Sequence, residues 1–242
     1  MNTKTFIKLF EDSFRKNFNR PALNDYGTTT AFTYGEFARE IAKLHILFQE
    51  SGIVPGDKIS LIGKNTAHWA IVHLATITYG AVIVPVLQDF NPNDVSHIIN
   101  HSESKLLFTS DSIWDSLDEE KLLNIKGAFS ITANRLLFQQ DGAQLDVLLS
   151  QLDNQFHGKY PKGFTAKDIV YSSLPDSEVL VLNYTSGTTG FSKGVMITGG
   201  NLKGNMDFAH ENICLKSGDR MLSFLPLAHT YGAAFDYLYA LT

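Results

Sequence analysis

Residues 56–86 read GDKISLIGKNTAHWAIVHLATITYGAVIVPV, and this stretch decides the fold class. "ISLIG" and "AVIVPV" are short apolar runs of the kind found in strands that a parallel sheet buries on both faces. The apolar residues between them, which end near Gly80, predict a buried helix. Because His73, Gly80 and Pro85 interrupt the apolar run, we do not expect a membrane span.

The same alternation of strand and helix extends over residues 58–132. "KLLFTS" and "GAFSIT" are further predicted strands, and Asn91–Pro92 predicts the start of another helix. This order is typical of an α/β fold, so we expect a mostly parallel sheet flanked by helices on both faces. Asn65 is the predicted cap of the helix that ends near Gly80.

The flanking regions carry weaker patterns. Phenylalanine recurs every four residues from Phe6 to Phe18, which predicts an amphipathic helix, and a short hairpin is expected to turn near Gly27. Thr33 and Glu36 have the spacing of a capping box that opens a helix. We expect residues 138–177 to form a long connection. "MLSFLPLAH" predicts a strand and "AAFDYLYAL" a helix.

These patterns divide the chain into three expected parts. Residues 1–49 would form N-terminal helices and a hairpin, and residues 50–215 an α/β subdomain that carries a phosphate loop. Residues 216–242 would begin a second, truncated subdomain. Because the helical pattern continues up to Thr242 without a capping residue, we expect that the chain is cut from a larger protein.

Composition excludes several classes of function. The 242 residues are 44% hydrophobic and 19% charged, which is typical of a globular protein with its own core. A net charge of −5 gives no electrostatic basis for binding nucleic acid. The single cysteine, Cys214, excludes an intrachain disulfide and a multi-cysteine zinc site. Charged residues from Lys8 to Asp12 interrupt any signal-peptide core, so we expect a cytoplasmic protein without a transmembrane segment.

Residues 185–193, TSGTTGFSK, stand between two strand-like runs. Glycines let backbone N–H groups converge on an anion, hydroxyls add donors, and Lys193 adds a positive charge. The stretch therefore predicts a site for phosphate, most plausibly a nucleotide polyphosphate. The spacing departs from GxxxxGK[ST], and a strand follows in place of a helix, so a kinase or GTPase loop is disfavoured. The alternative is a glycine-rich hairpin turn whose hydroxyls face water.

This stretch resembles a known family motif. "YTSGTTGFSKGV" at 184–195 is similar to the phosphate-binding motif of the adenylate-forming, AMP-binding superfamily, which includes acyl-CoA synthetases, adenylation domains and luciferases. "LPLAHTYG" at 225–232 resembles the next motif of that superfamily, and residues 56–86 resemble its early segment. Ser192 stands where the family usually has proline, and Gly199 where histidine is common. The family's ribose-binding aspartate and its C-terminal catalytic lysine belong to later motifs that this chain does not contain.

The resemblance implies a two-step reaction. A carboxylate attacks the α-phosphate of ATP to give acyl-AMP and pyrophosphate, and a thiol, usually that of coenzyme A, then displaces AMP. It also implies that Thr185 helps to bind Mg²⁺ and that His229 acts as a catalytic residue beside the acyl carboxylate. The residues implied to hold the β- and γ-phosphates of ATP are Ser186, Gly187, Thr188, Thr189, Gly190 and Lys193, and Thr185 adjoins them.

"LPLAH" with its histidine favours an acyl-CoA synthetase over an amino-acid adenylation domain. The expected parent is therefore an AMP-forming ligase of coenzyme A and a long-chain fatty acid, and this piece alone would turn over little or no substrate. Two alternatives within the class are another acyl or aryl acid ligase and an acyl-AMP ligase that loads a carrier protein. A third is a non-catalytic nucleotide-binding module. Expected partners are the carboxylic acid, ATP, coenzyme A and, through an exposed apolar surface, a second copy of the chain.

Overall fold

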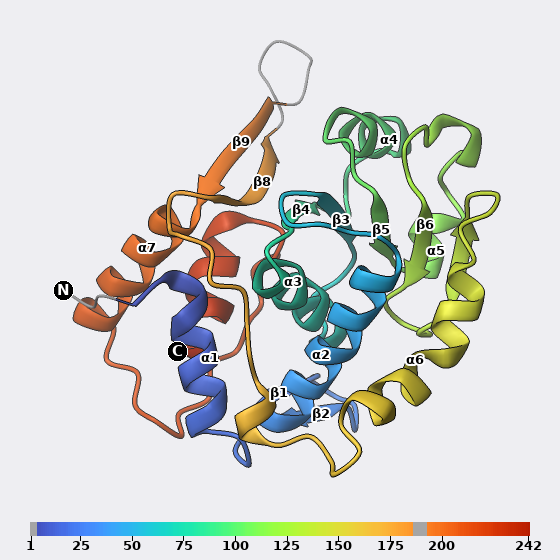
Figure 1. Ribbon diagram of the computed structural model, residues 1–242. Coiled ribbons are helices and arrows are strands. Elements are labelled where there is room, and N and C mark those ends of the chain that lie inside the picture. Colours follow the sequence, from blue (N-terminus) through green and yellow to red (C-terminus); the bar gives the residue numbers. More distant parts are fainter. Residues whose placement is uncertain (1–3, 186–192) are drawn as a thin grey trace.

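The computed structural model describes residues 4–185 and 193–242 of the chain (Figure 1). Seven strands form one sheet in the order β7-β6-β5-β3-β4-β8-β9, and β1 and β2 form a separate hairpin. The strands are β1 Pro21–Asn24, β2 Ala31–Thr33, β3 Lys58–Ile62, β4 Val82–Val86, β5 Leu106–Thr109, β6 Gly127–Ser130, β7 Leu136–Gln139, β8 Val179–Thr185 and β9 Lys193–Thr198. Strands β3, β4, β5, β6 and β8 are parallel, whereas β7 and β9 are antiparallel to their neighbours. The predicted α/β class with a mostly parallel sheet is confirmed.

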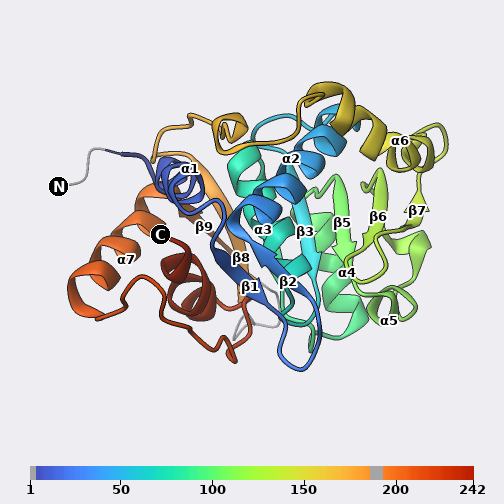
Figure 2. The ribbon, with the colours of Figure 1, turned by 90° about the horizontal axis from the view of Figure 1, so that it is seen from below.

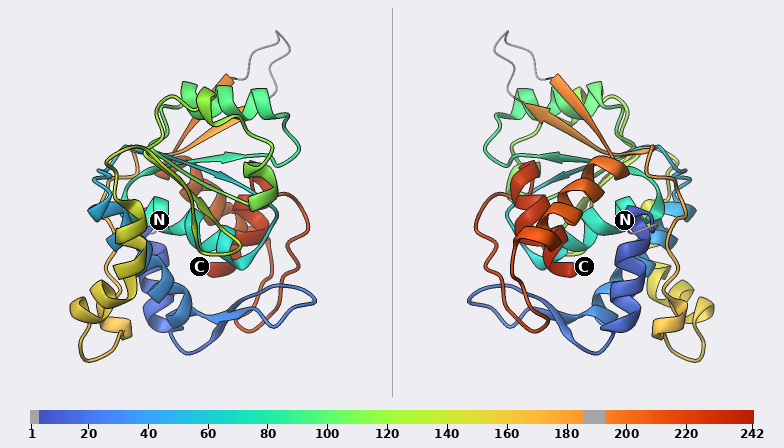
Figure 3. Two further views of the ribbon diagram at one scale, coloured as in Figure 1. Left: turned by 90° about the vertical axis from the view of Figure 1, so that its right-hand side faces the viewer. Right: turned by 90° about the vertical axis from the view of Figure 1, so that its left-hand side faces the viewer.

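Helices cover both faces of this sheet (Figures 2 and 3). The α-helices are α1 Phe6–Lys16, α2 Tyr34–Glu50, α3 Ala67–Tyr79, α4 Pro92–His101, α5 Asp111–Trp114, α6 Leu145–Lys159 and α7 Gly199–Asn212. A π-helix spans Gly232–Leu238, and short 3-10 helices span Glu119–Lys121, Ala166–Asp168 and Tyr239–Leu241.

Successive residues of the central strands belong to two separate hydrophobic clusters, one on each face of the sheet. In β3, Leu61 belongs to the larger cluster, to which α1, α2, α3, α6, α7 and the π-helix contribute. Its neighbour Ile62 belongs to the smaller cluster, together with Val95 and Ile98 of α4 and Trp114 of α5. Side chains of a strand alternate between faces, so the near-continuous apolar sequence of β3 and β4 is what a sheet buried on both sides requires.

Local signals place several helices where the sequence predicts them. The α2 capping box is present: the Thr33 hydroxyl accepts the Glu36 N–H at 3.2 Å, and the Glu36 carboxylate accepts the Thr33 N–H at 2.8 Å. Asn91 caps α4 ahead of Pro92. Helix α3 ends at Gly80, whose φ of +95° lies in the left-handed region that suits glycine. The phenylalanine-rich N-terminal helix is confirmed as α1.

Three local predictions are wrong. Thr66, and not Asn65, caps α3, since its hydroxyl accepts the Trp69 N–H at 3.1 Å. The expected long connection at 138–177 contains α6. The residue before this helix, Gln144, has a left-handed backbone conformation, and its side chain does not cap the helix. "MLSFLPLAH" forms no strand among the described residues. Side chains from elsewhere in the fold bind parts of its backbone instead.

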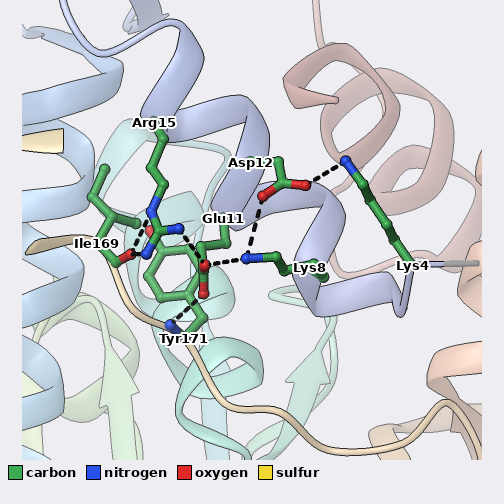
Figure 4. Close-up of polar contacts among 7 residues, drawn as sticks. All are labelled: Lys4, Lys8, Glu11, Asp12, Arg15, Ile169 and Tyr171. Atoms are coloured by element: carbon green, nitrogen blue, oxygen red, sulfur yellow. Dashed lines mark hydrogen bonds and ion pairs between the residues drawn. The ribbon is translucent and has the colours of Figure 1, made fainter. Parts of the chain in front are cut away.

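A buried carboxylate joins α1 to the segment that leads into β8 (Figure 4). Glu11 is 6% exposed; it forms ion pairs with Lys8 and with Arg15, the latter at 2.9 Å, and accepts the Tyr171 N–H at 2.9 Å. The Arg15 guanidinium also donates to the Ile169 carbonyl at 2.6 and 2.9 Å. Burial of a charge is tolerable only with such partners, so this cluster fixes α1 against residues 169–171.

Within residues 4–185 and 193–242, no helix is long and apolar enough to span a bilayer.

Candidate functional site

The two ends of the glycine-rich stretch lie side by side at the edge of the sheet. Thr185 is the last residue of β8 and Lys193 is the first residue of β9, and they are directly opposite in the antiparallel register. Residues directly opposite in such a pair project to the same face, so the exposed hydroxyl and ammonium groups share one face. The prediction that the stretch joins two strands is confirmed. Ser186, Gly187, Thr188, Thr189 and Gly190 lie outside the described residues.

The other face at this point is closed by an aromatic residue. Tyr184 is buried beneath α4, and its hydroxyl lies 2.6 Å from Nδ1 of His101. Burial raises the pKa of the Tyr184 phenol, so its hydroxyl stays protonated and can hydrogen-bond to the imidazole. The two residues are 83 positions apart, and sequence reasoning missed this contact. It fixes the end of β8 immediately before Thr185.

Asparagine side chains hold the segment that carries His229. Asn65, just after β3, accepts the Leu227 N–H at 2.9 Å and donates to the Leu225 carbonyl at 2.7 Å. Asn183 of β8 donates to the Ala228 carbonyl at 3.2 Å. Asn183 and Thr185 are two positions apart in one strand, so their side chains lie on the same face. The fold therefore brings His229 to the face that carries Thr185 and Lys193.

His229 itself is exposed and has a defined hydrogen-bonding pattern. The backbone N–H of His229 donates to the Pro226 carbonyl at 2.9 Å in a tight turn. The Tyr231 N–H donates to Nδ1 of the imidazole at 3.3 Å. A ring nitrogen that accepts a hydrogen bond carries no proton in neutral imidazole, so the proton lies on Nε2. His229 can thus present a donor to a ligand in front of it.

This cluster lies at the carboxyl edge of the parallel strands. Thr185 ends β8, and Asn65 follows the end of β3 by three residues. In open parallel α/β sheets, ligands bind in the crevice outside the carboxyl ends of the strands. The position favours a binding site over a surface turn.

A cavity of about 70 Å³ adjoins the His229 segment. Its walls come from α3, β4, β8, β9, α7 and the 227–238 segment, and they are mostly aliphatic. Four of its lining residues are polar: His73, Asn183, Asn205 and Thr230. Asn205 and Thr230 are exposed, so the cavity meets solvent beside His229, whereas His73 is only 1% exposed.

Residues 10–242 match the model of the family described as "AMP-binding enzyme". The chain belongs to the AMP-binding enzyme family. The suspected resemblance to adenylate-forming enzymes is therefore confirmed, and the match covers the Thr185–Lys193 pair and His229 together.

Curated relatives of the chain include acid–CoA ligases of different specificity. The chain is 29% identical over 212 residues to a long-chain-fatty-acid–CoA ligase of Mycobacterium bovis, which covers 87% of the chain and 34% of the relative. It is also 29% identical over 214 residues to a sulfoacetate–CoA ligase of Cupriavidus necator, covering 88% of the chain and 38% of the relative. The chain thus spans about a third of the length of the curated relatives it matches.

Solved structures agree on the fold of this AMP-binding enzyme. An anthranilate CoA ligase in complex with anthranoyl-AMP superposes with a TM-score of 0.79 at 14% identity, over 98% of this chain and 42% of that one. At this identity the likeness establishes the architecture alone. The sheet, with its mixed edges, has the architecture of the matched part of that ligase.

The described residues offer Mg²⁺ little coordination of their own. Among them there is no cluster of three or more His, Cys, Asp or Glu side chains that could hold a metal. Mg²⁺ usually keeps several waters and binds substrate phosphates together with one or two protein oxygens. The exposed Thr185 hydroxyl fits the part of one such oxygen for an ion that arrives with ATP.

Proposed function

We propose that this AMP-binding enzyme activates a carboxylic acid with ATP, forming acyl-AMP and pyrophosphate, and then transfers the acyl group to coenzyme A. The observation that carries the proposal is the convergence of Thr185, Lys193 and His229 on one face at the carboxyl edge of the sheet. The family match makes ATP the expected nucleotide.

The first step requires two anions to meet. The acid is a carboxylate and its target is the α-phosphate of a polyanion, so fixed positive charge and oriented donors must offset their repulsion. We assign Lys193 to the β- and γ-phosphates, together with residues 186–190. Thr185 would contribute to Mg²⁺, which supplies further positive charge when bound. The Nε2–H of His229 would donate to the acyl carboxylate.

We propose a long-chain fatty acid as the acid. The fatty-acid ligase of Mycobacterium bovis supports this choice, but the sulfoacetate ligase of Cupriavidus necator is equally similar. An acyl-AMP ligase that loads a carrier protein differs only in the acceptor thiol. A non-catalytic nucleotide-binding module is the second candidate.

Three further expectations remain proposals. They are the division at residues 50 and 216, a cytoplasmic location, and a homodimer. Two exposed apolar side chains support the homodimer, since Leu222 and Phe224 are 69% and 76% exposed. Sedimentation of the purified protein over a concentration range would test the dimer.

Carboxylate-dependent ATP–pyrophosphate exchange tests the reaction. We expect exchange by the intact protein with one class within a panel of fatty, aryl and sulfonated acids. Lys193→Met should lower the rate by about 10²–10³, the range for loss of one preorganised charge-stabilising group. Lys162→Met, at another exposed lysine, is the control and should not change the rate. Saturable Mg·ATP binding without exchange for any acid would favour the non-catalytic module.

A further inference from the structure

The closed end of the cavity contains an unusual group for an aliphatic pocket. His73 is buried, and its Nδ1 has no hydrogen-bond partner among the described residues. An unpaired buried polar atom destabilises the folded state, so most such atoms in folded proteins are satisfied by protein, water or ligand. His73 is also one of the residues that line the cavity beside the His229 segment.

The His73 ring is held in place from two sides. Trp69 stacks on it with ring centroids 5.0 Å apart and 19° between the planes. Tyr237 contacts it edge-on at 5.6 Å, and the Tyr237 hydroxyl is itself fixed on the Ala70 carbonyl at 2.7 Å. The imidazole therefore cannot turn to solvent for a partner, and a group that satisfies it must come to the cavity.

The charge of the lining restricts what that group can be. Burial lowers the pKa of His73 to about 3, so the ring is neutral at physiological pH. Among the described residues, no Asp, Glu, Lys or Arg lines the cavity. A second carboxylate, a sulfonate or an ammonium group would lose its hydration there without an opposite charge, which is strongly unfavourable.

Asn183 narrows the choice among uncharged groups. Its Nδ2 donates to the Ala228 carbonyl, which leaves the amide oxygen as the acceptor it can offer. A neutral imidazole nitrogen either donates or accepts. A hydroxyl is a small uncharged group that can do both at once. One water needs roughly 10–15 Å³ of such space, so a cavity of about 70 Å³ holds a hydroxyl with a few neighbouring carbons.

Resting on the proposed function, we propose that this cavity binds a hydroxyl-bearing part of the acid substrate and that His73 is a specificity-determining residue for that hydroxyl. The cavity opens beside Thr230, the neighbour of His229, so the acid's carboxylate would remain at the reacting edge. The surrounding aliphatic walls would contact the carbons next to the hydroxyl.

The test compares acids that differ only at one end. ATP–pyrophosphate exchange by the intact protein is measured with alkanoic acids from short to long chains, their ω-hydroxy analogues and their dicarboxylic analogues. At the best chain length we expect kcat/KM for the hydroxy acid to exceed that of the alkanoic acid about tenfold or more, with the dicarboxylic acid lowest. Tenfold corresponds to about 1.4 kcal/mol, within the value of one satisfied buried polar atom.

Variants separate recognition from folding. His73→Leu should bring the ratio of hydroxy to alkanoic acid down to about one, and His73→Gln, which keeps a neutral donor and acceptor, should restore part of it. His45→Leu removes a histidine that bonds to the Ala75 carbonyl outside the cavity, and should leave the ratio unchanged. Because the ratio compares two acids on the same enzyme sample, loss of folded protein does not alter it.

A ratio of one or less at every chain length in the unmodified protein would overturn the inference, as would an unchanged ratio in His73→Leu. Exchange with no acid at all would instead overturn the proposed function. In that case saturation-transfer NMR with the same pairs of acids decides the role of the cavity. Selective binding of the ω-hydroxy acid that His73→Leu abolishes would support it, and equal binding would contradict it.

Discussion

The central strands and the hairpin at the edge of the sheet differ sharply in burial. In β4 and β5 every residue is buried, whereas the first four residues of β9 are all exposed. The central strands carry hydrophobic residues to both clusters and so supply most of the stability. The hairpin of β8 and β9 carries Thr185 and Lys193 beyond those clusters, where charge and hydroxyls remain available to a ligand. The proposed ligand-binding residues Thr185 and Lys193 thus lie where the buried part of the sheet ends.

The largest test of this contrast is a matched pair of truncations. Leu61→Ala, at a residue of β3 that is 0% exposed, should lower the free energy of unfolding by about 2–5 kcal/mol because it leaves a cavity. Met196→Ala, at a residue of β9 that is 70% exposed, should change it by less than about 0.5 kcal/mol. Urea unfolding measures both. Equal losses would show that the hairpin is part of the stabilising core.

The pH dependence of stability tests the burial of His73 in the core. The pKa of His73 is about 3 in the folded protein and near 6.5 unfolded, so the unfolded state binds more protons between these values. Stability should therefore be complete above about pH 6.5 and fall as the pH drops, with about 2 kcal/mol lost through His73 between pH 7 and 5. Urea unfolding at the two pH values should show this loss, and His73→Gln should remove it. An equal loss in His73→Gln would assign the effect to other groups.

Asn65 follows the central strand β3 and holds the segment that carries His229, so its removal should affect the site more than the core. Asn65→Ala deletes both hydrogen bonds to the 225–227 backbone and should cost about 1–3 kcal/mol. Hydrogen exchange of the Leu227 amide should speed up, while amides of β3 change little. Lys64→Ala, at the exposed neighbour, is the control. Unchanged exchange at Leu227 would mean that the segment is held by other contacts.

The smallest test uses two equivalent helix caps. Thr33 caps α2 on the core, and Thr198 caps α7 directly after β9, each in a capping box. Replacement of either by alanine should cost about 1 kcal/mol. We expect Thr33→Ala to lower the stability of the whole domain, and Thr198→Ala to speed exchange mainly within α7. Global loss from Thr198→Ala would show that α7 unfolds together with the core.

Local sequence patterns determined much of the scaffold. The Phe6–Phe14 spacing gave α1, the Thr33–Glu36 pair gave the start of α2, and Gly80 gave the end of α3. These signals work because a cap or an apolar face involves residues within a turn or two of each other. Helix α6 was missed because it begins without such a cap and buries only Leu145, Leu152 and Phe156.

The sequence by itself also determined the family and pointed to Thr185, Lys193 and His229, because motif residues are contiguous in the chain. Only the tertiary structure decided that the three share a face. The contacts responsible join Asn65 to a segment 160 residues away and Asn183 to one 45 residues away. The orphaned Nδ1 of His73 likewise emerges only when α3 packs against Tyr237. A side chain's hydrogen-bond partners and burial are set by packing among distant elements, and no local pattern records them.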